Sequence, residues 1–270
     1  MSKTENRKYW ALILGASSGF GGSVAVKLAQ DGYNIIGIHL DRQATMPAVE
    51  EIIKEIEKSG SEAYFFNVNA ADEKKRKEIV QKIKKKLDNK PAIKVVMHSL
   101  AFGTLKPFIS DKTEQITKAQ MEMTLDVMAH SLVYWIQEIF NNNLLADKCR
   151  IFAMTSSGGH SSIPFYGAVS AAKAALESHV RQLAYELGPL NAAVNSIMAG
   201  VTETPALKKI PGNQSMMDVA ISKNPRNRLT TPEDIAKVIS ILCKDGGEWI
   251  SGGIINADGG EDIVSYMGEN

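Results

Sequence analysis

Short apolar stretches alternate with amphipathic helical patterns along almost the whole chain. Each of these segments reads as one buried strand: YWALILGAS, NIIGIHL, AYFFNVNA, IKVVMHSL, RIFAMTSS, AAVNSIMAG and GGIINADGG. Apolar runs of this length joined through helices indicate a parallel sheet that is covered on both faces. The alternation therefore predicts an α/β fold with a doubly wound parallel sheet, of the Rossmann type.

No Pro/Gly/Ser-rich linker and no internal repeat divides the 270 residues. We therefore predict a single dinucleotide-binding domain over residues 1–270. The longest irregular segment is 202–232, which contains Pro205, Pro211, Pro225 and Pro232. A long loop in a compact domain is often a lid or binding loop, so this segment is the expected substrate loop, with a plain surface excursion as the alternative.

The composition excludes several classes of partner. Formal net charge is +1 and charged residues make up 23%, so we expect neither a nucleic acid nor a membrane as partner. The basic run 82–90 lies on a helical pattern and fits a solvated face. Cys149 and Cys243 lack a pairing motif, and the N-terminus lacks an apolar signal core. These features predict a cytoplasmic protein.

A glycine-rich turn follows the first strand and opens a helix. Gly15, Gly19 and Gly21 permit a tight turn and let a pyrophosphate approach the backbone, while the helix N-terminus supplies free N–H groups. In this strand-turn-helix context the pattern predicts a dinucleotide site, with a merely tight turn as the alternative. The candidate contacts are Gly15, Ser17, Ser18, Gly19, Phe20 and Gly21.

The end of the second strand bears on the choice between NAD and NADP. A carboxylate there binds the ribose 2′-OH, whereas a basic residue accepts the 2′-phosphate. His39 stands where the carboxylate is expected, Asp41 is two residues on, and Arg42 follows. Because Arg42 and His39 are available, we predict that NADPH is preferred over NADH.

The G-x-x-x-G-x-G spacing resembles that of the short-chain dehydrogenase/reductase family, with Leu14 in place of the usual threonine. The resemblance implies that Asn67 and Val68, at the end of the third strand, contact the adenine; a structural role for this polar strand end is the alternative. It also implies that the segment AGVTETPA contacts the nicotinamide and opens the substrate loop. The residues concerned there are Gly200, Val201, Thr202 and Thr204.

Two further segments resemble the bacterial enoyl-acyl-carrier-protein reductases within that family. HSLAFG supplies Ser99, Leu100 and Ala101 where most members read N-N-A-G, and PFYGAVSAAK supplies the Tyr-x6-Lys signature. Ketoreductases have a tyrosine where Val169 stands and an asparagine where Met128 stands. The segment TSSGGHSS is most similar to the short, NADPH-using branch of these reductases, which carries a serine ten residues before the tyrosine.

The resemblance implies catalytic roles for Tyr166, Lys173 and Ser156. Seven residues of helix span about 10.5 Å at nearly the same azimuth, so Tyr166 and Lys173 can face one cleft. An enoyl reductase delivers hydride to the β-carbon, and negative charge then develops on the thioester oxygen, which calls for a displaced proton donor. Lys173 would bond the nicotinamide ribose and favour the enolate, Tyr166 would donate to its oxygen, and Ser156 or Ser157 would assist. The alternative is a helix-start tyrosine and a surface lysine.

Three functional hypotheses follow. The first is an NAD(P)H-dependent enoyl thioester reductase of fatty-acid synthesis, acting on an acyl-carrier-protein or CoA thioester. The second is a divergent carbonyl or 3-ketoacyl reductase, and the third is a non-catalytic dinucleotide-binding sensor. No metal-ligand spacing surrounds His98 or His160, so no metal is expected. His98 is predicted to be a hydrogen-bonded strand-end residue, and His160 a loop residue.

Two sets of apolar residues remain open to more than one interpretation. The family commonly forms homotetramers, and apolar positions on two predicted helices (119–140 and 168–187) belong either to an interface or to the core: Val133, Trp135, Ile136 and Leu183. In the substrate loop, Met216, Met217 and Ile221 either line an acyl channel or serve as packing residues.

Overall fold

The predicted strands form one parallel sheet in the order β3-β2-β1-β4-β5-β6-β7. This computed structural model describes residues 7–210 and 212–265. The strands are β1 (Trp10–Leu14), β2 (Asn34–His39), β3 (Ala63–Asn67), β4 (Ile93–His98), β5 (Leu145–Thr155), β6 (Ala193–Ala199) and β7 (Ile254–Ala257). The strand order reverses between β1 and β4, which makes their carboxyl ends the switch point where doubly wound sheets bind ligands. The predicted fold is confirmed.

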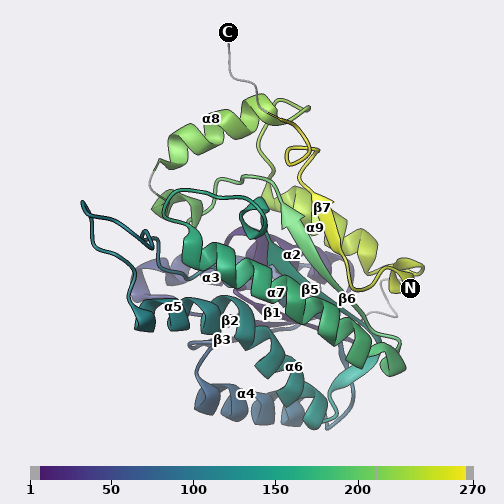
Figure 1. Ribbon diagram of the computed structural model, residues 1–270. Coiled ribbons are helices and arrows are strands. Elements are labelled where there is room, and N and C mark those ends of the chain that lie inside the picture. The colour runs from purple at the N-terminus through teal and green to yellow at the C-terminus, as the bar shows by residue number, and fades with distance from the viewer. Residues whose placement is uncertain (1–6, 211, 266–270) are drawn as a thin grey trace.

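Two layers of helices cover the sheet (Figure 1). On one face lie α4 (Glu73–Lys86), α6 (Ser131–Asn141) and α7 (Gly167–Glu186); on the other lie α2 (Gly19–Gln30), α3 (Met46–Lys58) and α9 (Pro232–Leu242). Because both faces are covered, every residue of β1, β2, β4 and β6 is buried. Within the described ranges, no helix combines the length and apolarity that a membrane span requires.

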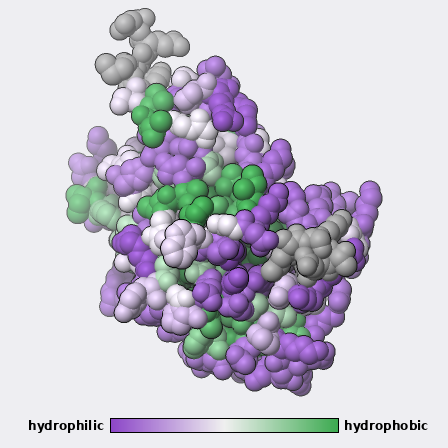
Figure 2. Space-filling view, turned by 90° about the vertical axis from the view of Figure 1, so that its right-hand side faces the viewer, coloured by the Kyte–Doolittle hydropathy of each residue, from purple (hydrophilic) through white to green (hydrophobic). Residues whose placement is uncertain are grey.

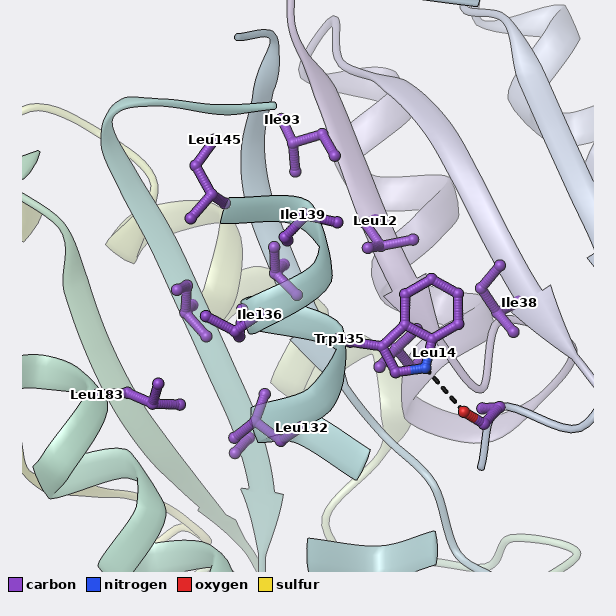
Figure 3. Close-up of a cluster of buried hydrophobic side chains, with 14 of the residues drawn as sticks. Leu12, Leu14, Ile38, Ile93, Leu132, Trp135, Ile136, Ile139, Leu145 and Leu183 are labelled. Atoms are coloured by element: carbon purple, nitrogen blue, oxygen red, sulfur yellow. Dashed lines mark hydrogen bonds between the residues drawn. The ribbon is translucent and has the colours of Figure 1, made fainter. Parts of the chain in front are cut away.

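The core beneath α6 settles one of the open interpretations. Figure 3 shows the Trp135 indole beside Leu14 and Ile38, and its Nε1–H donates to the carbonyl oxygen of Ala70 over 2.9 Å. Trp135, Ile136 and Leu183 are all buried in this cluster, so they belong to the core and not to an interface between subunits. Val133 is half-buried.

The long helix predicted over residues 119–140 is not continuous. It divides into α5 (Lys118–Leu125), a π-helical turn η2 (Asp126–His130) and α6. The Ser131 hydroxyl donates to the Val127 carbonyl inside this turn. Wide turns of this kind often accompany functional sites, because they redirect the side chains that they carry. Here the turn carries Met128, which lines the cleft described below.

The expected irregular segment 202–232 contains helical structure, which corrects that prediction. A 3₁₀ turn η5 (Leu207–Lys209) is followed by α8 (Asn213–Lys223), which stands apart from both layers at the top of Figure 1. The prolines had marked the segment as irregular, but Pro205 and Pro225 lie outside α8 and Pro232 begins α9. Pro211 lies outside the described residues. The stretch 213–223 carries no proline and is free to form a helix.

Candidate functional site

A cleft of about 260 Å³ opens at the carboxyl edge of the sheet, beside the switch point. Eleven of the predicted site residues line it: Phe20, Ser99, Leu100, Ala101, Ser156, Tyr166, Lys173, Gly200, Val201, Thr202 and Thr204. The remaining predicted residues lie on the glycine turn and at the ends of β2 and β3: Gly15, Ser17, Ser18, Gly19, Gly21, His39, Arg42, Asn67 and Val68. The two groups adjoin, because Gly19 faces the Thr204 side chain.

The glycine turn closes tightly against the end of β4. A Cβ atom on Gly21 would lie 2.0 Å from the carbonyl oxygen of Gly15, and one on Gly15 would lie 2.5 Å from that of Ser99. Gly19, with φ +53°, opens α2, and the N-cap residue Ser18 makes no side-chain hydrogen bond to the first turn. No acidic residue stands in that turn. The helix N-terminus therefore fits an anionic group such as a dinucleotide pyrophosphate.

The ends of β2 and β3 are joined by a polar network around Asp41. Its carboxylate is 2.9 Å from His39 Nδ1 and accepts a 2.8 Å bond from the Thr45 hydroxyl, while Asn67 bonds both the N–H and the carbonyl of Asp41. Partial burial favours a higher pKa for Asp41, but hydrogen bonding from Ser17, Thr45 and His39 outweighs it and lowers the pKa. Asp41 stays charged, with both oxygens engaged.

His98 is a buried, neutral strand-end residue. The Ser131 hydroxyl donates its one hydrogen to the Val127 carbonyl. It must therefore accept the hydrogen bond from His98 Nε2, which lies 2.8 Å away. Burial lowers the pKa of His98 to about 3, and the nearby Lys173 charge adds to the effect. Such a ring cannot exchange protons near neutral pH. His160, by contrast, is exposed in a loop, 3.1 Å from Asp262.

Lys173 is buried, which excludes the surface-lysine alternative. Its side chain extends from α7 to the end of β5, where Nζ donates to the Met154 carbonyl over 2.6 Å. The residue is 7% exposed, and desolvation lowers its pKa to about 8, partly opposed by the Glu177 carboxylate. An ammonium has three N–H groups. One is bonded within the described chain, and the others remain available to a group in the cleft.

Tyr166 is the N-cap residue of α7, just before the helix. Burial raises the pKa of its phenol, and the nearby Ser156 hydroxyl partly opposes this shift. The two hydroxyl groups are not aligned for a hydrogen bond with each other. Ser156 Oγ is buried and finds no partner among the described residues. Ser156 lines the cleft, so this hydroxyl can hydrogen-bond a polar group bound there.

The place that a ketoreductase tyrosine and asparagine would occupy is filled by apolar groups. A Cβ atom on Gly103 would lie 2.7 Å from Val169 Cγ2 and 2.9 Å from Met128 Sδ. The segment after β4 therefore packs directly over these two side chains. Sequence reasoning did not single out Gly103; the signal was a glycine within the loop that follows the fourth strand.

The substrate side of the cleft was largely missed from the sequence. It is lined by apolar residues from the segments that follow β4, β5 and β6: Phe102, Leu105, Ile163, Ala206, Leu207 and Ile210. Phe102 and Ala206 fall within the quoted segments HSLAFG and AGVTETPA, but no common period or motif links the six residues. Of the three loop residues proposed for an acyl channel, Met216 lines the cleft, whereas Met217 and Ile221 do not.

Comparisons with known proteins agree with this geometry. The family model described as Enoyl-(Acyl carrier protein) reductase matches residues 15–261. The enoyl-[acyl-carrier-protein] reductase [NADH] FabI of Aquifex aeolicus is 26% identical over 248 residues, which cover 91% of this chain and 89% of FabI. Versicolorin reductase stcU of Emericella nidulans is also 26% identical, over 266 residues that cover 93% of this chain and 94% of that protein.

Solved structures share the fold. The crystal structure of the enoyl-[acyl-carrier-protein] reductase (NADH) from Aquifex aeolicus VF5 has a TM-score of 0.84 at 23% identity, covering 97% of this chain and 99% of that one. The angucycline C-6 ketoreductase LanV with bound NADP has a TM-score of 0.82 at 21% identity, covering 96% and 97%. Because the family match spans most of the chain, the protein belongs to the Enoyl-(Acyl carrier protein) reductase family of short-chain dehydrogenases/reductases, as an oxidoreductase that uses a nicotinamide cofactor.

Proposed function

We propose that the protein is an enoyl thioester reductase that reduces trans-2-enoyl chains on acyl-carrier protein or CoA in fatty-acid synthesis. The observation that carries the proposal is the interval between Tyr166 and Lys173 in one cleft. Val169 stands between them, packed under Gly103, so no hydroxyl is offered at the ketoreductase position. The tyrosine that lines the cleft is the displaced one.

Each of the three polar side chains then has a separate task. When bound, the nicotinamide cofactor supplies a hydride to the β-carbon of the substrate. Tyr166, whose half-buried phenol keeps its proton, donates it to the thioester oxygen, where negative charge develops. The resulting enol becomes the saturated thioester when its α-carbon takes up a proton and its hydroxyl proton returns to Tyr166. The unpartnered Ser156 hydroxyl adds a second hydrogen bond there. Lys173 offers its free N–H groups to the nicotinamide ribose, and its positive charge favours the enolate.

The apolar side of the cleft supports an acyl substrate. Phe102, Leu105 and Ile210 line the same cleft as Tyr166, so an alkyl chain attached to the thioester would be covered by apolar surface. Incubation with crotonyl thioester and NADPH or NADH tests the proposal, with loss of nicotinamide absorbance as the readout. Turnover with neither cofactor would refute it.

The proposal includes a preference for NADPH. Both carboxylate oxygens of Asp41 are engaged by His39 and Thr45, which leaves Asp41 poorly placed to accept a bond from a ribose 2′-OH. Arg42 is exposed, and no partner for its guanidinium is found in the described part of the chain, so it can meet a 2′-phosphate. We expect tighter binding of NADPH than of NADH, and Arg42→Ala to weaken NADPH alone. Tighter binding of NADH by the wild type would overturn the preference.

A second candidate is a carbonyl or 3-ketoacyl reductase. It is favoured by the likeness to versicolorin reductase stcU, which has the same identity as the likeness to FabI. The chemistry would have to proceed with Val169 and Met128 in place of tyrosine and asparagine. Acetoacetyl thioester discriminates the two candidates, because turnover of this substrate and not of crotonyl thioester would favour the second.

The proposal also includes a cytoplasmic homotetramer. Cys149 and Cys243 are both free thiols, which suits a reducing compartment. The edge strand β7 leaves Ile254 exposed, and the neighbouring Trp249 is 94% exposed. Figure 2, which looks onto the right-hand side of Figure 1, shows separate apolar areas within a mainly hydrophilic surface. A second copy of the chain would cover such groups. Light scattering should give four times the 29.4 kDa chain mass, and a monomer would refute this part.

A further inference from the structure

Glu261 is a buried carboxylate directly beneath the cleft. It follows β7, is 7% exposed, and accepts a hydrogen bond from the backbone N–H of Val201, which lies 3.1 Å from one carboxylate oxygen and 3.2 Å from the other. Val201 and its neighbours Gly200 and Thr202 line the cleft. The approach is close, because a Cβ atom on Gly200 would lie 2.6 Å from Glu261 Oε2. A carboxylate from the end of the chain therefore supports the segment that follows β6.

The chain that returns after α8 is also fixed beside Val201. Asn224, the residue after α8, is 3% exposed and donates from its amide to the Asp258 carbonyl over 2.9 Å. The N–H of Thr230 donates to the Val201 carbonyl over 3.2 Å. Both backbone groups of Val201 are thus bonded, one to Glu261 and the other to the return of the chain after α8. The start and the end of the segment that carries α8 are fixed at one point.

Burial of this carboxylate has a cost. Desolvation and the Asp258 charge raise the pKa of Glu261, while the Val201 N–H, Lys223 and Asn224 oppose the shift. A folded-state pKa above the unfolded value means that ionised Glu261 lowers stability as pH rises through that range. The geometry supplies the reason to look for a role here, because this carboxylate accepts from the Val201 N–H at the wall of the cleft.

We propose that Glu261 is a positioning residue that holds the Gly200–Thr204 segment, and with it the nicotinamide side of the cofactor site, in the geometry that binds cofactor. A charged acceptor bonds a backbone N–H about twice as strongly as a neutral one, so it fixes Val201 more firmly than an amide would. The inference rests on the proposed role of this segment in holding the nicotinamide.

The test compares Glu261→Ala and Glu261→Gln with a matched control, Asp262→Asn. The neighbouring Asp262 also loses one negative charge in the control, but its carboxylate faces His160 at the surface. We expect the KM for NADPH to rise about tenfold in Glu261→Ala and about threefold in Glu261→Gln, with kcat within about twofold. The control should stay close to wild type. Hydrogen exchange should accelerate over residues 200–224 in both Glu261 variants.

Two readouts separate this role from a merely structural one. Because Glu261→Gln keeps an acceptor for the Val201 N–H, it should stay folded and melt close to wild type while binding NADPH more weakly. Unchanged NADPH affinity and unchanged hydrogen exchange in Glu261→Gln would overturn the inference, whether or not Glu261→Ala folds. If the wild type binds NADPH but reduces no enoyl thioester, and the variants still lose affinity, the proposed function fails and this inference stands.

Discussion

The two sides of the cleft are built in different ways. On the cofactor side, backbone groups set the geometry: the glycine turn rests on the carbonyl of Ser99, and Lys173 is tied to the carbonyl of Met154. On the substrate side, side chains form the surface, and Phe102 is 56% exposed. The first side has little freedom to vary, whereas the second can change its shape by changing its residues.

This difference follows from what each side has to hold. The reacting atoms must meet at fixed positions, so the groups around them are buried and bonded to strands. In the proposed reaction the substrate carries an alkyl chain without polar atoms to align, so apolar side chains on the segments after β4, β5 and β6 are sufficient. Substitutions on the cofactor side should therefore affect every substrate, and those on the substrate side should affect particular chain lengths.

The largest effect is expected for Lys173→Met. The variant keeps most of the side-chain volume but removes the ammonium that is proposed to hold the nicotinamide ribose, and we expect kcat/KM to fall on the order of a thousandfold for every substrate. Steady-state kinetics with short and long enoyl thioesters check this. Lys237→Met, at an exposed lysine on α9, is the control and should behave as wild type. A fall of kcat/KM for long-chain substrates alone would contradict the distinction between a cofactor side and a substrate side.

Tyr166→Phe should have the next largest effect. The substitution removes the proton donor and keeps the ring, so kcat should fall about a hundredfold while the affinity for NADPH is retained. Tyr185→Phe, at a tyrosine 81% exposed on the same helix, is the matched control. Full activity in Tyr166→Phe would remove this residue from the chemistry and return Ser156 to consideration as the donor.

The sequence already indicated the residues that meet on the proposed cofactor side, because the geometry there dictates residue identity. Gly15 and Gly21 admit no side chain, and Tyr166, the N-cap residue of α7, must stand at a fixed interval from Lys173 within that helix. Ser156 was identified because the segment around it is similar to that of the NADPH-using reductases. That its hydroxyl has no partner among the described residues is known only from the structure. The fold followed for a similar reason, since buried parallel strands leave long apolar runs.

The substrate side was poorly predicted because nothing local determines it. The adjacent Met216 and Met217 are identical in type, and the orientation of α8 alone decides that Met216 lines the cleft. The π-helical turn over Asp126–His130 left no periodic signal strong enough to interrupt the predicted helix. Glu261 acts through the backbone N–H of Val201, a group that every residue except proline possesses, so no motif could point to it.

Gly158→Ala tests the position of Tyr166, which lies between the cofactor side and the substrate side of the cleft. A Cβ atom on Gly158 would lie 2.5 Å from the Tyr166 ring, so the ring must move away from its place in the cleft. We expect kcat to fall about tenfold, with NADPH affinity unchanged, because even a small misplacement of a reacting group is costly. Gly188→Ala is the control, since a Cβ atom there meets nothing within 4 Å. Equal kinetics in the two variants would show that Tyr166 needs no exact position.

The pH dependence gives a smaller and more specific effect. Lys173 has a pKa of about 8, so its charge is present below that pH and is lost above it. The Glu177 carboxylate raises this pKa, and Glu177→Gln should therefore move the alkaline fall of kcat/KM to lower pH, by up to about one unit. Glu186→Gln, at an exposed glutamate of the same helix, should leave the profile in place. An unmoved profile in Glu177→Gln would show that the fall reports another group.

The smallest expected effect lies on the substrate side. Met216 lines the cleft and Met217 does not, so their alanine variants form a matched pair one residue apart. Truncation at 216 removes apolar contact from an acyl chain that reaches α8, and KM for a long-chain enoyl thioester should rise about fivefold, with crotonyl thioester unaffected. Met217→Ala should change neither substrate. Because crotonyl thioester carries the same reacting atoms, an equal loss with both substrates would mean that α8 acts on the chemistry, and the two sides would then not be separable.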